Sequence, residues 1–314
     1  MTDVLKVGNL VANPGEKVQG LLTVQNTDQA MPVTLINGSR PGKTVAITCG
    51  VHGGEYPGIE TGIRLARELQ PSDVSGRLII LHPANVWAFQ AKLQYVGPWD
   101  GKNLNRMFPG QALGTFTERI AYTITTELFA QADFYMDLHG GDIHEDLVPF
   151  VLYPAAADPE VTRVSREAAN CLGVPFVVGS VSTTGTFGSA AAMGVPGFLG
   201  EIGGRGLWSE AEVSAYLAGV HNVLTYLNVL SGEVQQLAQS ELLDRMVGTN
   251  AEHAGCWYPT VRPGQTVQVG DNLGEIRDYF GQVLSTYQAT LSGTVLYVIS
   301  SLAINAGDPL VAIG

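Results

Sequence analysis

The stretch TVAITCGVHGGEYPG, residues 44–58, joins a short apolar run to a glycine-rich turn and a proline. An apolar run of this length, bounded by glycine, is typical of a buried strand. Pro57 suits the first turn of a helix, where its missing N–H costs little. The stretch therefore predicts a strand, a tight glycine loop and a helix in succession, which is the repeating unit of an α/β fold.

The same alternation continues to about residue 230. Thr115 and Glu118 form a TxxE capping box ahead of one helical pattern, and Ser209 with Glu212 marks the start of the last long helix. Strands that alternate with helices are typical of a largely parallel sheet with covering helices. The further apolar runs are RLIILHP (77–83), DFYMDLHGG (133–141), PFVVG (175–179) and GFLGEIGG (197–204).

The pattern changes near residue 235. Short alternating segments broken by glycines, such as 265–276 and 293–299, replace the helical period and predict a small all-β domain. We therefore expect a large domain over residues 1–235 and a C-terminal β domain over residues 236–314. The second domain resembles the barrel-sandwich fold of biotinyl and lipoyl domains, but the last lysine of the chain is Lys102. A carrier protein is thereby excluded, and we expect the domain to shape the site mouth or to support a homo-oligomer.

Composition excludes several classes of partner. The net charge of -12 over 314 residues repels phosphate backbones and anionic lipid surfaces, so we expect no nucleic-acid partner. No apolar run approaches the roughly 20 residues that a membrane helix needs, so we expect no membrane partner. The three cysteines form no CxxC spacing and the first residues do not resemble a signal peptide. These features predict a cytoplasmic location.

Candidate metal ligands follow the predicted strands. His52 and Glu55 stand in HxxE spacing after the first strand, and His139 and Glu201 follow two others. Parallel strands end at one edge of a sheet, so these side chains should converge there. Two imidazoles and a carboxylate form the three-ligand set of catalytic zinc, which leaves a position for water. We expect one Zn²⁺ at His52, Glu55 and His139, with Glu201 as general base and then general acid.

Two further positions fit supporting roles. Asp137 lies two residues before His139 on the same strand face, where it can accept the N–H of that imidazole and fix its tautomer. Asn105 and Arg106 stand together in NLNR, and a guanidinium beside an amide can hold a carboxylate by paired hydrogen bonds. A structural alternative for Arg106 is an ion pair with Asp100.

In order, the motifs HGGE, NLNR, DLHGG and GEIGG resemble the succinylglutamate desuccinylase/aspartoacylase family of the zinc carboxypeptidase group, over about residues 40–230. The resemblance implies a mixed, mostly parallel sheet with helices on both faces. It implies zinc at the two histidines and Glu55, a substrate carboxylate at NLNR, and Glu201 as base. The chain looks most similar to members of the N-acetyl-diaminobutyrate deacetylase type, which implies hydrolysis of a small N-acyl amino acid.

The chain departs from the family at one point, because residues 93–102 contain no arginine to polarise the scissile carbonyl. Losing such a donor typically costs about 2.7–4 kcal/mol of transition-state stabilisation. Tyr95 and Arg205 are the candidate replacements. The acidic loop after the second histidine, with Asp142, His144, Glu145 and Asp146, predicts an amino acid with a cationic side chain.

Two alternative functions stay open. One is a zinc carboxypeptidase that removes a C-terminal residue from peptides, and the other is a catalytically weak metabolite-binding relative. The retained Glu201 argues against the second, because a binding protein does not need a base at this position. Cobalt, manganese or nickel can also occupy a site with two nitrogen ligands and one oxygen ligand.

Overall fold

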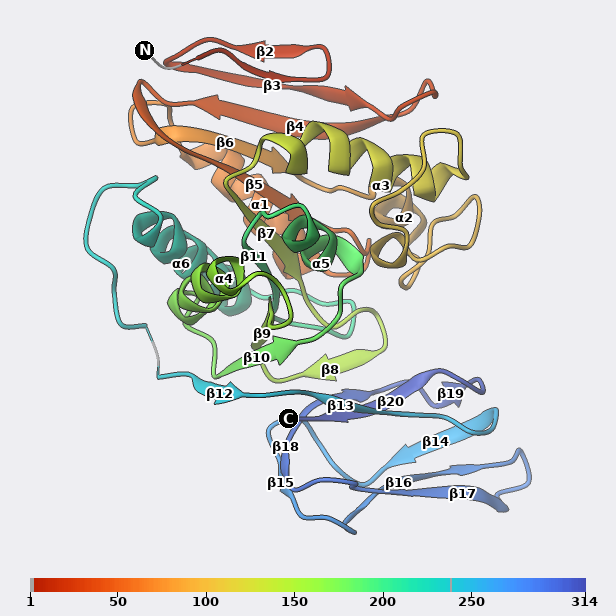
Figure 1. Cartoon of the computed structure of the whole chain (residues 1–314). Helices are drawn as coiled ribbons and strands as arrows, with labels where there is room; N and C mark the ends of the chain where they lie inside the picture. Colours follow the sequence, from red (N-terminus) through yellow and green to blue (C-terminus); the bar gives the residue numbers. More distant parts are fainter. Residues whose placement is uncertain (1–2, 238) are drawn as a thin grey trace.

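The computed structural model describes residues 3–237 and 239–314 and contains an α/β region and a smaller all-β region (Figure 1). Within these residues, a nine-stranded sheet forms the centre of the α/β region. Five of its eight described strand pairs are parallel and three are antiparallel, so the expected mixed, mostly parallel sheet is confirmed. In spatial order the strands are β12 (Glu241–Leu243), β10 (Phe176–Ser180), β9 (Phe150–Pro154), β11 (Gly197–Glu201), β7 (Phe134–His139), β5 (Arg40–Cys49), β6 (Ser75–Leu81), β4 (Ala30–Asn37) and β3 (Glu16–Thr23).

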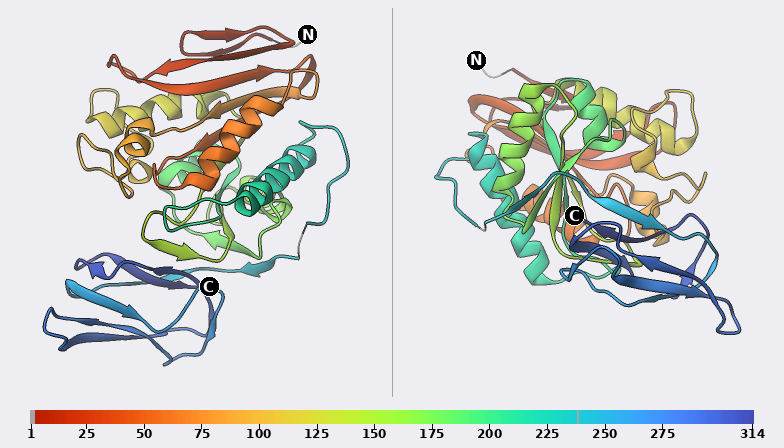
Figure 2. Two further views of the ribbon diagram at one scale, coloured as in Figure 1. Left: turned by 180° about the vertical axis from the view of Figure 1, so that it is seen from behind. Right: turned by 60° about the horizontal axis from the view of Figure 1, so that its bottom comes forward.

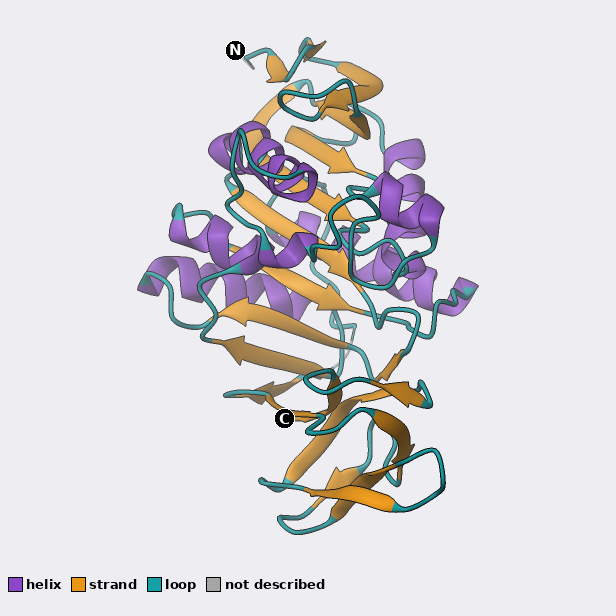
Figure 3. Ribbon diagram, turned by 90° about the vertical axis from the view of Figure 1, so that its right-hand side faces the viewer, coloured by secondary structure: helices purple, strands orange, loops and turns teal. Residues whose placement is uncertain are grey.

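Helices cover both faces of this sheet (Figure 3). Successive residues of a strand point to opposite faces, so Val45 and Ile47 of β5 join one buried cluster and Ala46 joins the other. Helices α1, α4 and α6 pack on the first cluster, and α2, α3 and α5 on the second. The helices are α1 (Tyr56–Glu68), α2 (Val86–Ala91), α3 (Phe116–Glu127), α4 (Pro159–Cys171), α5 (Gly185–Ala192) and α6 (Glu210–Tyr226), with 3-10 turns η1 (Leu104–Arg106) and η2 (Phe129–Gln131).

The helix starts follow the capping signals in the sequence. The Thr115 amide donates to the Glu118 carboxylate over 2.7 Å and the reciprocal bond is also present, so the predicted capping box opens α3. The Ser209 side chain accepts from the Glu212 amide at the start of α6. The last helix ends at Tyr226, a few residues before the alternating pattern ends at about residue 230.

The C-terminal region consists of two antiparallel sheets around a core that includes Trp257, Leu273 and Val295. Strand β8 (Glu145–Leu147) leaves the α/β region and pairs with β18, which joins the two regions. Figure 2 places the β region against one end of the larger region. Its strands are β13 (Val247–Asn250), β14 (Gly255–Pro259), β15 (Thr266–Val267), β16 (Asn272–Arg277), β17 (Val283–Gln288), β18 (Gly293–Ile299), β19 (Ala303–Ile304) and β20 (Pro309–Ile313).

The ends of the α/β region are less simple than the sequence suggested. A two-stranded ribbon, β1 (Leu5–Val7) and β2 (Leu10–Ala12), precedes the large sheet. Strand β12 lies after the expected domain boundary at residues 235 and 236, yet it joins the large sheet beside β10. The boundary itself stays a prediction. No helix in the described ranges has the length and apolar character to span a membrane. The cytoplasmic location, the homo-oligomer and the absence of a nucleic-acid partner also stay predictions.

Candidate active site

The loop between β5 and α1 carries His52 and Glu55. Gly50 begins this loop with φ +72°, a conformation that L side chains rarely adopt. A Cβ at Gly53 would lie only 2.2 Å from the backbone nitrogen of Phe89, so only glycine fits there. These two glycines allow the tight turn that directs both side chains toward one point.

Two neighbouring strands supply the other predicted residues. His139 ends β7 and Glu201 ends β11, and the parallel register pairs the two residues directly. Strand β5 lies parallel to β7 on its other side, with Cys49 beside Leu138. The carboxyl edge of the sheet therefore brings together the four residues expected to converge there.

The His52, Glu55 and His139 side chains form a compact buried cluster. His52 Nδ1 lies 2.7 Å from Glu55 Oε1, and His139 Nδ1 lies 2.8 Å from Glu55 Oε2. One ligand atom from each residue lies within 4.8 Å of the others. The three residues are at most 7% exposed. Burial raises the pKa of Glu55, but His139 and His52 outweigh that effect and lower it to about 2.

The second nitrogen of each imidazole is held by an acceptor. His52 Nε2 lies 3.0 Å from Asn103 Oδ1, which also accepts from the Asn105 amide. His139 Nε2 lies 2.9 Å from Asp137 Oδ2. Because both partners are acceptors, each Nε2 holds a hydrogen, and loss of the Nδ1 proton would give a neutral ring whose Nδ1 lone pair points toward Glu55.

With both rings neutral, two imidazole lone pairs face the oxygens of one buried carboxylate. Lone pairs at such distances repel one another unless a proton or a metal cation lies between them. His52, Glu55 and His139 therefore fit a divalent cation held through two Nδ1 atoms and a Glu55 oxygen.

Asp137 fixes the orientation of the His139 ring through its contact with Nε2. It is fully buried, and its carboxylate accepts from the hydroxyls of Thr48 and Thr186 as well as contacting His139. These hydrogen bonds fix the carboxylate and, through it, the imidazole. Neither threonine was predicted, nor was Asn103, although Asn103 is the first asparagine of the NLNR motif.

Glu201 faces the cluster from the next strand. Its Oε2 atom is buried and has no hydrogen-bond partner among the residues that the structure describes. Burial and the negative charge of Glu55 raise the pKa of Glu201 well above its usual range. The Tyr216 hydroxyl bonds the carbonyl oxygens of His139 and Gly200, which ties the two strand ends together.

The NLNR segment forms the 3-10 turn η1. Asn105 Oδ1 accepts from the Thr186 amide over 2.9 Å, which leaves the Asn105 NH₂ group as a donor. Arg106 is exposed, lines the same pocket, and makes no ion pair with any residue in 3–237 or 239–314. The alternative pairing with Asp100 does not form, because that carboxylate accepts from the Thr117 amide and hydroxyl instead.

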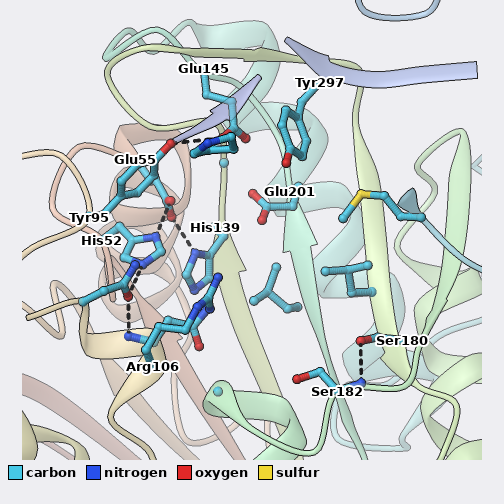
Figure 4. A pocket seen from close by; sticks show the side chains of 18 of the residues that line it. His52, Glu55, Tyr95, Arg106, His139, Glu145, Ser180, Ser182, Glu201 and Tyr297 are labelled. Atoms are coloured by element: carbon cyan, nitrogen blue, oxygen red, sulfur yellow. Dashed lines mark hydrogen bonds and ion pairs between the residues drawn. The ribbon is translucent and has the colours of Figure 1, made fainter. Parts of the chain in front are cut away.

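The four residues line a cavity of about 730 Å³ together with both candidate carboxylate-binding residues (Figure 4). Arg106 enters it from the side opposite Glu145 and Tyr297. Apolar side chains from the sheet and α5 form part of its wall, and the C-terminal region forms another part. The apolar residues are Phe150, Leu152, Phe187 and Leu199, and the C-terminal residues are Met246, Asn250, Tyr297, Gly307 and Pro309.

The structure corrects the predicted acidic loop. Of its four members only Glu145 lines the pocket. Asp142 is fully buried and accepts from the Tyr95 and Ile143 amides, and Asp146 lies 3.7 Å from the Arg205 guanidinium. Burial and the charge of Glu55 raise the pKa of Glu145 to about 8.

The two candidate replacements for the missing arginine also differ from expectation. The Arg205 side chain is 57% exposed beside Asp146 and does not line the pocket. Tyr95 does line it, but its hydroxyl donates to Glu145 Oε2 over 3.2 Å. Neither side chain therefore offers a free donor beside the histidines.

A mixed α/β sheet with a buried His–Glu–His cluster at its carboxyl edge is typical of metal-dependent hydrolases. Residues 41–227 match the model of the Succinylglutamate desuccinylase/Aspartoacylase catalytic domain, and the chain belongs to this family. The resemblance predicted from the four motifs is thereby confirmed.

Similar proteins span nearly the whole chain. The N-alpha-acetyl-L-2,4-diaminobutyric acid deacetylase of Halomonas elongata is 29% identical over 93% of this chain and 89% of its own length. The product-bound ectoine utilization protein EutE (DoeB) of Ruegeria pomeroyi is 29% identical, with a TM-score of 0.86, over 95% and 94% of the two chains. A succinylglutamate desuccinylase of Silicibacter is 28% identical, with a TM-score of 0.81, over 95% and 94%.

Proposed function

We propose that this chain hydrolyses the amide bond of a small N-acyl amino acid, with one zinc ion held by His52, Glu55 and His139. The observation that carries this proposal is the buried cluster of three ligand atoms within 4.8 Å, opposite the unpartnered Glu201 carboxylate. Membership of a family whose named members remove acyl groups from amino acids supports the reaction class.

A zinc ion at these residues supplies Lewis-acid polarisation and lowers the pKa of water to roughly 7. Glu201 takes the proton of the attacking water and then gives it to the leaving nitrogen. The raised pKa of this buried carboxylate makes it a stronger proton acceptor, and a bound dication would favour the ionised form that the first step needs. Asp137 and Asn103 hold the Nε2 hydrogens of His139 and His52, which keeps both Nδ1 lone pairs available.

The NLNR turn holds the substrate carboxylate in this proposal. Arg106 donates through its planar guanidinium, and Asn105 donates through the NH₂ group that its bond to Thr186 leaves free. A carboxylate fixed at this point sets how far the scissile amide reaches toward the histidines. The clamp therefore selects substrates with a free carboxylate next to the amide nitrogen.

The amino acid that we propose carries a cationic side chain, as in N-acetyl-2,4-diaminobutyrate. The similar Halomonas protein is named for that substrate. Of the acidic residues in the predicted loop after His139, Glu145 lines the cavity. It makes no ion pair with Lys or Arg within the described chain. A substrate ammonium group beside Glu145 would favour the ionised form of this carboxyl group and pair with it.

The C-terminal region favours this function over a peptide carboxypeptidase. Five of its residues line the cavity and limit its volume to about 730 Å³, which suits a small molecule. We propose that the region is a barrel-sandwich domain that lids the mouth of the site.

Amine release from a panel of N-acyl amino acids and short peptides tests the proposal. We expect release from N-acetyl-2,4-diaminobutyrate, less from N-acetylaspartate, and none from tripeptides. Release from the peptides alone would support the carboxypeptidase instead. No release from any compound, with the zinc content verified, would favour a metabolite-binding protein. A preference for N-acetylaspartate would overturn the proposed cationic side chain.

A further inference from the structure

The cavity contains hydroxyl donors besides Tyr95, and one of them, Tyr297, comes from the C-terminal region. Tyr297 belongs to β18 of the C-terminal region and lines the same pocket as the histidines. Figure 4 shows its ring pointing into the pocket with the hydroxyl turned toward Glu201. No hydrogen bond from this hydroxyl to another residue is present in the described ranges 3–237 and 239–314.

The strand pairing explains how a residue so distant in the sequence reaches the site. Strand β18 pairs antiparallel with β8, with Tyr297 opposite Leu147 and Ile299 opposite Glu145. On its other side β18 pairs with β20 inside the C-terminal sheet. Two ladders therefore fix the backbone of Tyr297 relative to β8.

The positions of the other donors give this hydroxyl a role. Ser180 and Ser182 also line the cavity, but both lie away from Glu145 and Tyr297 (Figure 4), and Thr184 contacts Ser182. Arg106 lies on the opposite side of the cavity, where it serves the substrate carboxylate in the proposed function. The Tyr95 hydroxyl is bonded to Glu145, and Arg205 lies outside the pocket. The chain lacks the family arginine. On the Glu145 side of the pocket, the Tyr297 hydroxyl is thus the side-chain donor that has no hydrogen-bond partner within the described residues.

We infer that Tyr297 is a catalytic residue whose hydroxyl donates a hydrogen bond to the carbonyl oxygen of the scissile amide. The inference rests on the proposed function. As water adds to the carbonyl carbon, negative charge develops on that oxygen, and a donor fixed in a water-poor cavity stabilises it. The hydroxyl keeps its proton throughout, so no further acid or base is needed.

The surroundings of Tyr297 support a neutral hydroxyl. Burial and the nearby Glu145 and Glu201 carboxylates raise its pKa, although Arg106 acts in the opposite direction. A phenol with a raised pKa stays protonated at neutral pH and can donate. The C-terminal region would then belong to the catalytic apparatus, in addition to its place at the mouth of the site.

The test is the full-length zinc-loaded Tyr297→Phe variant, which keeps the ring and removes only the hydroxyl. Losing one donor to a developing oxyanion lowers kcat about 10²–10³-fold, while KM changes little. Tyr258→Phe is the matched control, because Tyr258 lies in the same β region, is 40% exposed and is outside the cavity. Zinc content and the melting temperature should equal those of the parent.

If the kcat of Tyr297→Phe falls by no more than about threefold, the loss is far smaller than expected and the inference is overturned. A rise in KM alone would assign the hydroxyl to ground-state binding and would also overturn it. A parent that hydrolyses no panel compound contradicts the proposed function separately. The donor is then tested by calorimetry with the methylphosphonamidate of 2,4-diaminobutyrate, whose tetrahedral oxygen mimics the oxyanion. Tyr297→Phe should weaken that binding about 10²-fold, and equal affinities would contradict the inference.

Discussion

Glu201 and His139 are paired directly across the parallel strands β11 and β7, and each is the last residue of its strand. This register puts a carboxylate next to a predicted metal ligand without the help of a loop. Rigid strands hold side chains more accurately than loops do. The relative position of base and ligand in our proposal is therefore set by the sheet itself.

Replacing Glu201 by Gln should remove proton transfer while keeping the side-chain shape. General acid–base catalysis contributes about 10²–10⁴-fold, so we expect kcat to fall by that factor. Metal content should not change, because Glu201 is outside the ligand set. Steady-state kinetics and metal analysis check both points. Glu210→Gln on the exposed surface is the control, and an active Glu201→Gln enzyme would remove Glu201 from the mechanism.

Replacing Asp137 by Asn should weaken metal binding. The change removes the negative charge beside His139 Nε2, and loss of such a partner typically costs 10–100-fold in metal affinity. Competition with a chromophoric chelator measures the zinc Kd. Asp146→Asn is the matched control because Asp146 is outside the pocket. Equal zinc affinities of parent and Asp137→Asn would show that His139 needs no support from this carboxylate.

Replacing Arg106 by Lys should raise KM and leave kcat nearly unchanged. Lysine keeps the charge but cannot make the paired hydrogen bonds, and a bond to a charged group contributes about 1.5–3 kcal/mol. We expect a rise in KM of about tenfold to a hundredfold for the acyl amino acid. The substrate amide, which lacks the carboxylate charge, should lose this discrimination. If parent and variant bind the acid equally well, the carboxylate is held elsewhere.

The Asp100 carboxylate should stabilise the fold in a pH-dependent way. Burial raises its pKa, but hydrogen bonds from Thr117 outweigh that effect and lower it. The stabilisation is then complete above the unfolded-state pKa of about 3.9 and disappears as the pH falls through the lower folded-state pKa. Thermal unfolding of Asp100→Asn should show a lower midpoint than the parent at pH 7. The two midpoints should converge under acid conditions.

The exposed Asp244→Asn variant provides the comparison for that experiment. Its midpoint should follow that of the parent across the pH range. The difference in unfolding midpoint between the parent and Asp100→Asn could instead stay constant down to pH values well below 3.9. The charge of Asp100 would then not be what stabilises the fold.

Local patterns predicted the parts of the site that depend on strand ends. The glycines around His52 predicted a tight turn after β5, and the apolar runs before His139 and Glu201 predicted two strands that end at the same edge of the sheet. The capping box of Thr115 predicted the start of α3. Each of these features is determined by residues within a few positions of one another.

Features that depend on distant contacts could not be predicted in the same way. The acidic loop was misread because Asp142 turns inward to the Tyr95 amide, 47 residues away in sequence. Arg205 adopts φ +61° and its side chain lies outside the pocket. Tyr297 stands in an alternating strand pattern that carries no mark of function, and only the β8–β18 pairing brings it to the cavity.

The β4–β3 hairpin at one edge of the sheet was also missed. Strand β4 follows β3 with a short connection and pairs antiparallel with both β3 and β6. The pattern of apolar runs that predicts parallel strands begins at Thr44, and no strand is predicted before it. Antiparallel additions to a parallel sheet are common and leave no motif of their own.

Metal removal tests the central claim most directly. The purified protein is assayed for amine release from N-acetyl-2,4-diaminobutyrate as isolated, after dialysis against a chelator, and after return of one equivalent of zinc. We expect amine release to disappear with the metal and to recover with one zinc per chain. The His52→Ala variant should neither bind the added zinc nor recover activity. Full hydrolysis by the metal-free protein would contradict that claim.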